Sequence, residues 1–175
     1  MPYGDWSGPG EAPAAGPGAG RSGVIRAWRL SKARYAADLT GQGAAREGQR
    51  WNPPGQRAVY LGLTPEITVL EVLVHLNGVL NAPLVLCAYD VPDGPELILE
   101  PDDTALPEGW NAVPHGQASA VFGGEWLRAV DHLGLVLPSV VVPQARNLLL
   151  NPLHPAMAQV ALVHQEPFQL DERLG

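Results

Sequence analysis

Residues 48–78 read GQRWNPPGQRAVYLGLTPEITVLEVLVHLNG, and this stretch predicts a polar loop, a short strand over residues 59–61 and a helix. The loop carries a cation, an aromatic ring and an amide, and the helix carries a carboxylate. These residues are Arg50, Trp51, Asn52 and Glu71. Such a set on three consecutive elements suits a pocket for a charged small molecule that contains a ring.

The predicted helix has clear signals at both ends. Thr64 is a suitable N-cap, Pro65 fits the first turn, and Asn77-Gly78 supplies a stop. Apolar residues cover nearly the whole circumference, which predicts a buried helix. They are Ile67, Val69, Leu70, Val72, Leu73, Val74 and Leu76. An ionised Glu71 there requires a partner, either His75 or an arginine in a structural pair, or else a functional role.

The composition is that of one acidic domain with a core. The chain has 175 residues, is 46% hydrophobic, and has a net charge of −7. This charge argues against general nucleic-acid binding, and no apolar run reaches the ~20 residues that span a membrane. The single cysteine and the spacing of the histidines argue against a disulfide and against a metal site. Without a secretory signal, we expect a cytoplasmic protein.

Two regions depart from this average composition. Residues 1–23 are rich in Gly, Pro and Ala without periodicity, which predicts a disordered tail. Eight of the 11 basic residues lie between positions 21 and 57. Such a basic lobe either concentrates a small anion or is an ordinary solvated face.

The remaining pattern interleaves strands with short helices. Strands are predicted over residues 24–30, 84–91, 135–142 and 157–164, and helices over 32–39, capped by Ser31, and over 124–132. Residues 92–118 read as an irregular excursion. Pro138 marks an edge or a bulge, and Ser139 lacks the context of a serine nucleophile. The order predicts a mixed α/β (α+β) domain, not a doubly wound fold.

In this order the motifs resemble those of the RES-domain family, the toxins of RES–Xre toxin–antitoxin systems. The resemblance covers residues 24–174. Its segments are Trp28-Arg29, residues 41–52, Val59-Tyr60, residues 70–73, residues 125–127, Pro138-Ser139, residues 147–155 and residues 168–174. This chain has Gly48-Gln49 where the family pattern has two glycines.

The resemblance implies a single ADP-ribosyltransferase-like domain over residues 24–175. It implies an NAD phosphorylase or NAD glycohydrolase, which splits the nicotinamide–ribose bond with phosphate or water as acceptor. NAD is then a substrate, no cofactor is needed, and an Xre-type antitoxin is the expected partner, with a homodimer also plausible. Two alternatives stay open: transfer of ADP-ribose to a protein target, and a non-catalytic nucleotide-binding module.

The resemblance also implies roles for particular residues. Arg29 and Arg50 would bind pyrophosphate or phosphate, for which a guanidinium is suited. Glu71 would orient ribose and stabilise positive charge. The other candidates are Tyr60 on the nicotinamide riboside, Ser139 at the nicotinamide end, and Asn52 and Asn147 as further substrate contacts. For Asn147, turn capping is the alternative.

Overall fold

The computed structural model describes residues 23–76 and 83–171, and this part of the chain is organised around one curved sheet. The seven strands lie in the order β4-β5-β6-β2-β1-β3-β7. Neighbouring strands are antiparallel, except that β4 and β5 are parallel. The strands are β1 (Gly23–Lys32), β2 (Val59–Gly62), β3 (Leu84–Asp93), β4 (Ile98–Leu99), β5 (Gly134–Pro138), β6 (Arg146–Leu150) and β7 (Ala161–Phe168).

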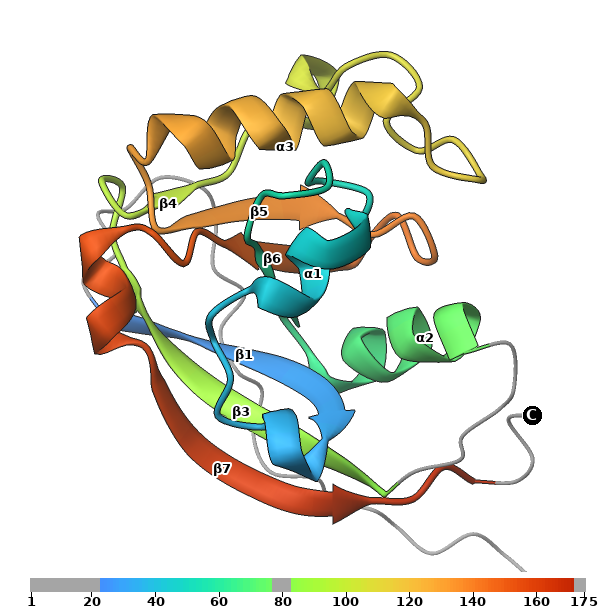
Figure 1. The fold of residues 1–175 in the computed structure, drawn as a ribbon, viewed down its shortest axis with the longest axis vertical. Helices are drawn as coiled ribbons and strands as arrows, with labels where there is room; N and C mark the ends of the chain where they lie inside the picture. Colours follow the sequence, from blue (N-terminus) through green and yellow to red (C-terminus); the bar gives the residue numbers. More distant parts are fainter. Residues whose placement is uncertain (1–22, 77–82, 172–175) are drawn as a thin grey trace, which may run out of the picture.

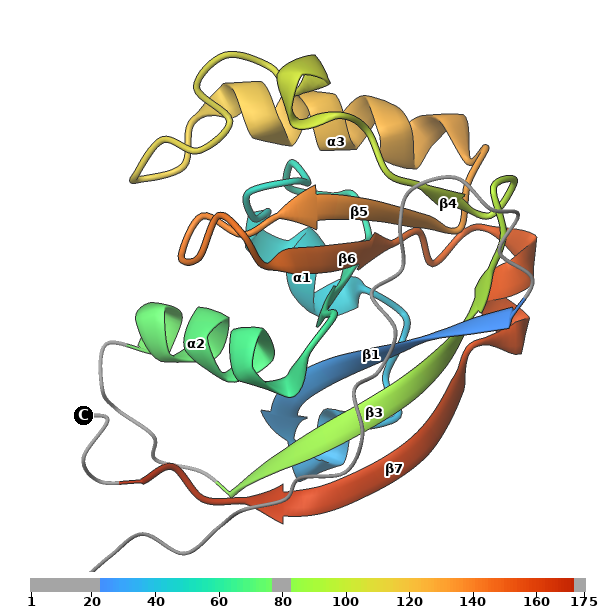
Figure 2. The same cartoon turned by 180° about the vertical axis from the view of Figure 1, so that it is seen from behind.

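The helices lie beside the sheet at different levels. They are α1 (Gln42–Glu47), α2 (Pro65–Leu76) and α3 (Gln117–Ala129), with short 3-10 helices η1 (Ala33–Tyr35), η2 (Asp103–Ala105) and η3 (Pro155–Gln159). Figure 1 shows α3 above β4, β5 and β6, whereas β1, β3 and β7 form the opposite half of the sheet. From both sides, α2 lies between the level of β6 and that of β1 (Figures 1 and 2). The predicted mixed α/β class is confirmed.

Two apolar cores lie on the two faces of the half-sheet that contains β6. The first core joins this half to the other and contains Cys87 and Tyr89, both from β3. The second core lies beneath α3 and contains Trp51. Because side chains alternate along a strand, Leu148 and Leu150 enter the first core and Leu149 enters the second. This burial on both faces explains the unbroken apolar run in β6.

Helix α3 packs unusually closely on the loop that follows α1. A Cβ atom on Gly123 would lie 2.0 Å from the carbonyl oxygen of Trp51, and one on Gly124 would lie 2.9 Å from Pro53. Both distances are too short for nonbonded atoms, so these two positions require the absence of a side chain. The glycine pair therefore lets α3 approach the backbone of this loop directly.

Several predicted elements have different bounds in the structure. The helix predicted over residues 32–39 is wrong, because β1 continues to pair with β3 as far as Lys32 and only the short η1 follows. Ser31 bonds to the Lys32 carbonyl and caps nothing. The helix predicted over residues 124–132 begins earlier, at Gln117, and ends at Ala129. The glycine pair inside α3 hid its first two turns from a propensity argument.

Two predicted strands are also corrected. The strand predicted over residues 135–142 ends at Pro138, and β5 lies inside the sheet between β4 and β6, not at an edge. The strand predicted over residues 157–164 is displaced toward the C-terminus. Residues before β7 form η3, whose first turn is capped by the His154 ring nitrogen accepting the Ala156 N–H.

Helix α2 starts where predicted, but the prediction that it is buried on all sides is partly wrong. It begins at Pro65 and runs to Leu76, while the predicted stop at Asn77-Gly78 lies outside the described residues. Ile67 is buried, but Leu70 is 38% and Val74 58% exposed. The helix is thus apolar on its outer face as well. Within the described residues, none of the helices combines the length and apolarity that crossing a bilayer requires.

We expect Gly123→Ala to destabilise the fold by about 1–3 kcal/mol, because the new methyl group meets a backbone carbonyl that cannot rotate away. The gain in helix propensity from alanine, about 1 kcal/mol, is smaller than this steric cost. The measurement is urea-induced unfolding. Gly43→Ala in α1 is the matched control, since nothing lies within 4 Å of the place that its new methyl group would take. A Gly123→Ala protein as stable as Gly43→Ala would contradict the packing.

Candidate functional site

The carboxylate of Glu71 is held by side chains from two other elements. One oxygen, Oε1, accepts a hydrogen bond from the Ser139 hydroxyl at 2.7 Å and another from the Asn147 amide at 2.8 Å. The Ser139 oxygen in turn accepts the backbone N–H groups of Val141 and Val142, both at 3.0 Å. These two bonds orient the hydroxyl so that its proton points to Glu71.

The strand register explains why these residues meet. Asn147 is the second residue of β6 and lies opposite Leu137 in β5, two residues before Ser139. On its other side Asn147 lies opposite Gly62, two residues from Tyr60 in β2. Alternation therefore places Tyr60 and Asn147 on one face of the sheet. The sequence-predicted partner His75 has its side chain outside the described part, so the predicted pair with Glu71 stays a prediction.

Arg50 is the cation of this site. Burial lowers the pKa of its guanidinium, and the nearby Glu71 carboxylate and Tyr60 phenol oppose that lowering. An arginine remains cationic at neutral pH even so. Its Nη1 donates to the carbonyl oxygens of Trp110 at 2.8 Å and Ala112 at 3.0 Å. The guanidinium thereby ties its own loop to the segment before α3.

Arg50 and Trp51 form the tip of a tight turn. Gln49 and Asn52 exchange backbone hydrogen bonds of 2.9 and 3.3 Å across it. Trp51 is 5% exposed and stacks on Trp110, with ring centroids 5.9 Å apart. The aromatic ring that the sequence suggested for a ligand pocket thus belongs to the second core. Burial of the Trp51 ring holds the turn in place, whereas the Arg50 side chain donates to the carbonyls of Trp110 and Ala112.

The departure from two glycines at positions 48 and 49 has a structural explanation. Gly48 adopts a φ of 75°, and a Cβ there would lie 2.9 Å from the Asn52 carbonyl oxygen. Gln49 instead makes the paired backbone bonds that close the turn. Glycine is therefore required at the first of the two positions.

Tyr60 and Asn52 are joined through their polar atoms. The Tyr60 hydroxyl donates to Asn52 Oδ1 at 2.8 Å and accepts the Trp51 N–H at 3.1 Å. Burial raises the pKa of this phenol. Asn52 is fully buried, and its amide nitrogen lies within bonding distance of three carbonyls, one in α1 and two in the loop that follows it. The substrate contact predicted for Asn52 stays a prediction.

Arg29 lies apart from these residues. It follows Trp28, which pairs with Gly62, so alternation turns Arg29 to the other face of β1. Its guanidinium donates to the Asp38 carbonyl at 2.7 Å. It also lies near Tyr89, whose pKa burial raises to about 12. The contacts described for Arg29 are thus with the η1 region and β3, and its predicted catalytic role stays a prediction.

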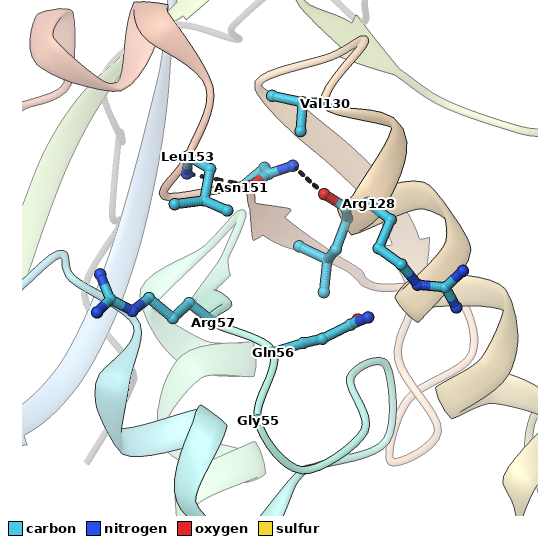
Figure 3. Close-up of a pocket in the computed structure, with 8 residues that line it drawn as sticks. Gly55, Gln56, Arg57, Arg128, Val130, Asn151 and Leu153 are labelled. Carbon is cyan, nitrogen blue, oxygen red and sulfur yellow. Dashed lines mark hydrogen bonds between the residues drawn. The ribbon is translucent and has the colours of Figure 1, made fainter.

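Two cavities lie outside the Glu71 cluster. One, of ≈ 300 Å³, lies at the C-terminal end of α3 and is lined by Arg57, Arg128, Asn151 and neighbouring residues. Figure 3 shows the guanidinium groups of Arg57 and Arg128 pointing away from it on opposite sides. The other, of ≈ 390 Å³, lies between the Gln49–Asn52 turn and the start of α3. Neither is lined by Glu71, Ser139 or Asn147.

The described part of the chain is thus a mixed α/β domain in which the Glu71 carboxylate is bonded to the Ser139 hydroxyl and the Asn147 amide. Comparison with known families places it further: the family model described as the RES domain matches residues 26–171. The chain therefore belongs to the RES domain family, and the resemblance seen in the sequence is confirmed.

Several known proteins are similar to this chain. The Prs ADP-ribosylating toxin of Sphingobium sp. (strain YBL2) is 38% identical, with 73% of this chain and 83% of that protein covered. Toxin Res of Yersinia enterocolitica is 36% identical, with 84% and 97% covered. The crystal structure of the M. tuberculosis MbcT–MbcA toxin–antitoxin complex contains a chain with a TM-score of 0.68. It is 20% identical, with 85% of this chain and 86% of that chain covered, and it shares the fold.

Sequence reasoning missed the groups that hold the Arg50 turn. The carbonyls of Trp110 and Ala112 lie in the excursion predicted to be irregular, and backbone acceptors leave no trace in a sequence. Gly123 and Gly124 did leave one. A glycine pair within an otherwise helical pattern indicates a close approach of another backbone.

We expect the unfolding free energy of the wild-type protein to fall more steeply above pH ~10 than that of Tyr60→Phe, by up to about 1.4 kcal/mol per pH unit. Burial keeps Tyr60 protonated in the folded state, whereas the unfolded chain releases this proton near its ordinary pKa. The measurement is urea unfolding at a series of pH values. Tyr89 is present in both proteins and cancels. Equal slopes would show that Tyr60 ionises in the folded protein.

Proposed function

We propose that this chain is the toxin of a toxin–antitoxin pair and that it consumes NAD by cleaving the bond between nicotinamide and ribose. Family membership supports the first part, together with relatives that carry the names Toxin Res and Prs ADP-ribosylating toxin. The neighbouring fold comes from a toxin–antitoxin complex, which supports an antitoxin as partner. That this antitoxin is of the Xre type is part of the proposal.

The observation that carries the enzymatic part is the Glu71 carboxylate held by Ser139 and Asn147. This carboxylate also interacts electrostatically with the Arg50 cation. Two donors on one carboxylate oxygen restrict the rotation of this side chain. A carboxylate that is oriented in advance is suited to stabilising a positive charge that develops during a reaction.

Cleavage of NAD generates such a charge. When the carbon–nitrogen bond breaks, its electron pair leaves with nicotinamide, which becomes neutral, and positive charge develops on the ribose ring. In this proposal Glu71 stabilises that charge and orients the ribose. Arg50 binds a phosphate oxygen of the dinucleotide, and Tyr60 presents its ring to the nicotinamide riboside. Arg29, which the sequence resemblance makes a second anion contact, lies on the other face of β1 and has no assigned step here.

The acceptor decides the product. A phosphate oxygen that attacks the ribose carbon gives ADP-ribose 1″-phosphate, and water gives ADP-ribose and a proton. A protein side chain as acceptor is the second candidate function, favoured by the relative named a Prs ADP-ribosylating toxin, which is 38% identical. The same bond breaks in all three cases, so Glu71 has the same role in each.

The experiment is to incubate the purified chain with NAD, with and without phosphate, and to read the products by mass. ADP-ribose or its 1″-phosphate supports NAD consumption, and the phosphate dependence identifies the acceptor. A parallel incubation with cell extract tests the second candidate, since protein that gains the mass of ADP-ribose indicates transfer. Intact NAD in every incubation rejects the enzymatic proposal and favours a non-catalytic binding module.

We expect Glu71→Gln to lower turnover by about 10²- to 10³-fold, because the amide retains the shape of the side chain but cannot stabilise positive charge. The measurement is initial-rate NAD consumption by protein whose folding is verified by thermal unfolding. Glu66→Gln, the same change in the exposed first turn of α2, is the matched control and should retain wild-type turnover. Comparable rates for the two variants would remove Glu71 from the catalytic site.

A further inference from the structure

The buried amide of Asn52 connects three segments next to the Arg50 turn. Its Nδ2 lies 3.0 Å from the carbonyl oxygen of Ala44 in α1 and 2.9 Å from that of Gln56 in the loop leading to β2. Its Oδ1 accepts the Tyr60 hydroxyl of β2. One side chain therefore joins a helix, a loop and a strand.

An amide is the side-chain group that fits these contacts. The Nδ2 side requires a donor and the Oδ1 side requires an acceptor, and asparagine supplies both on one short side chain. Aspartate would face carbonyl oxygens with no proton to give, and leucine would leave the Tyr60 hydroxyl without its acceptor. In a fully buried position either change leaves polar groups unsatisfied.

The Tyr60 hydroxyl bonds to the same turn both as a donor and as an acceptor. Its proton goes to Asn52, and its oxygen receives the N–H of Trp51. Trp51 and Asn52 directly follow Arg50 in the chain. The two hydrogen bonds thus fix the backbone on the C-terminal side of Arg50, while Gln49 closes the turn on the other side.

We propose that Asn52 is a positioning residue: through the Tyr60 hydroxyl and the Trp51 N–H it holds the turn that places Arg50 against the segment before α3. The Tyr60 hydroxyl then acts through Arg50 and is not a proton donor to substrate. This inference rests on the proposed function for its catalytic consequence. Its structural part, the coupling of Asn52 to the Trp51 amide, stands without it.

The test compares Asn52→Ala with Asn151→Ala. Asn151 is also a buried asparagine whose side chain bonds to backbone, donating to Leu127 and accepting from Leu153, but it lies at the cavity of Figure 3. Both variants lose buried hydrogen bonds, so both should unfold at lower temperature. Asn52→Ala alone should raise the KM for NAD, by roughly tenfold, with a smaller change in kcat.

Tyr60→Phe separates the two possible roles of the hydroxyl. If the hydroxyl acts through the turn, Tyr60→Phe and Asn52→Ala break the same connection. Their effects on KM are then less than additive in the double variant. Full additivity, or a KM in Asn52→Ala no higher than in Asn151→Ala, overturns the proposal.

A second measurement is independent of NAD. Hydrogen exchange of the Trp51 amide should be faster in Tyr60→Phe and in Asn52→Ala than in the wild type, and unchanged in Asn151→Ala. If the wild-type chain leaves NAD intact, the proposed function fails, and exchange at Trp51 alone decides the positioning role. Equal exchange rates in Asn52→Ala and Asn151→Ala overturn it.

Discussion

The site depends on a hydrogen-bonded amide in a place where water does not reach. A buried polar side chain costs free energy unless its donors and acceptors are paired, and Asn52 is paired on both sides. Because the same groups belong to α1, β2 and the loop between them, any rotation of this side chain breaks contacts in all three. The loop that carries Arg50 therefore behaves as part of the folded core.

The two charged residues of this site, Glu71 and Arg50, are held in place by different groups. Glu71 comes from α2 and receives its two donors from the ends of β5 and β6, whereas Arg50 comes from a turn that it ties to the segment before α3. Neither residue has to hold the other in place. Independent support of each charged group is a feature of pre-organised sites.

Features of this site that depend on neighbouring residues in the sequence could be predicted, whereas those that depend on strand pairing could not. Thr64 and Pro65 act locally, so the start of α2 was predictable. Ser139 and Asn147 were each candidates, but their meeting on one oxygen of Glu71 depends on the register between β5 and β6. Trp51 was assigned to a ligand pocket, because composition alone does not separate a core aromatic from an exposed one. The side of β1 that carries Arg29 follows from a pairing with β2 that no local pattern contains.

The position of the single cysteine has a practical consequence. Cys87 is fully buried in β3, between β1 and β7, and burial raises the pKa of its thiol. An alkylating reagent reacts with an accessible thiolate. While these strands stay paired, the Cys87 thiol is neither accessible nor readily ionised. Alkylation of Cys87 therefore requires the central strands to separate, and its rate reports how often they do.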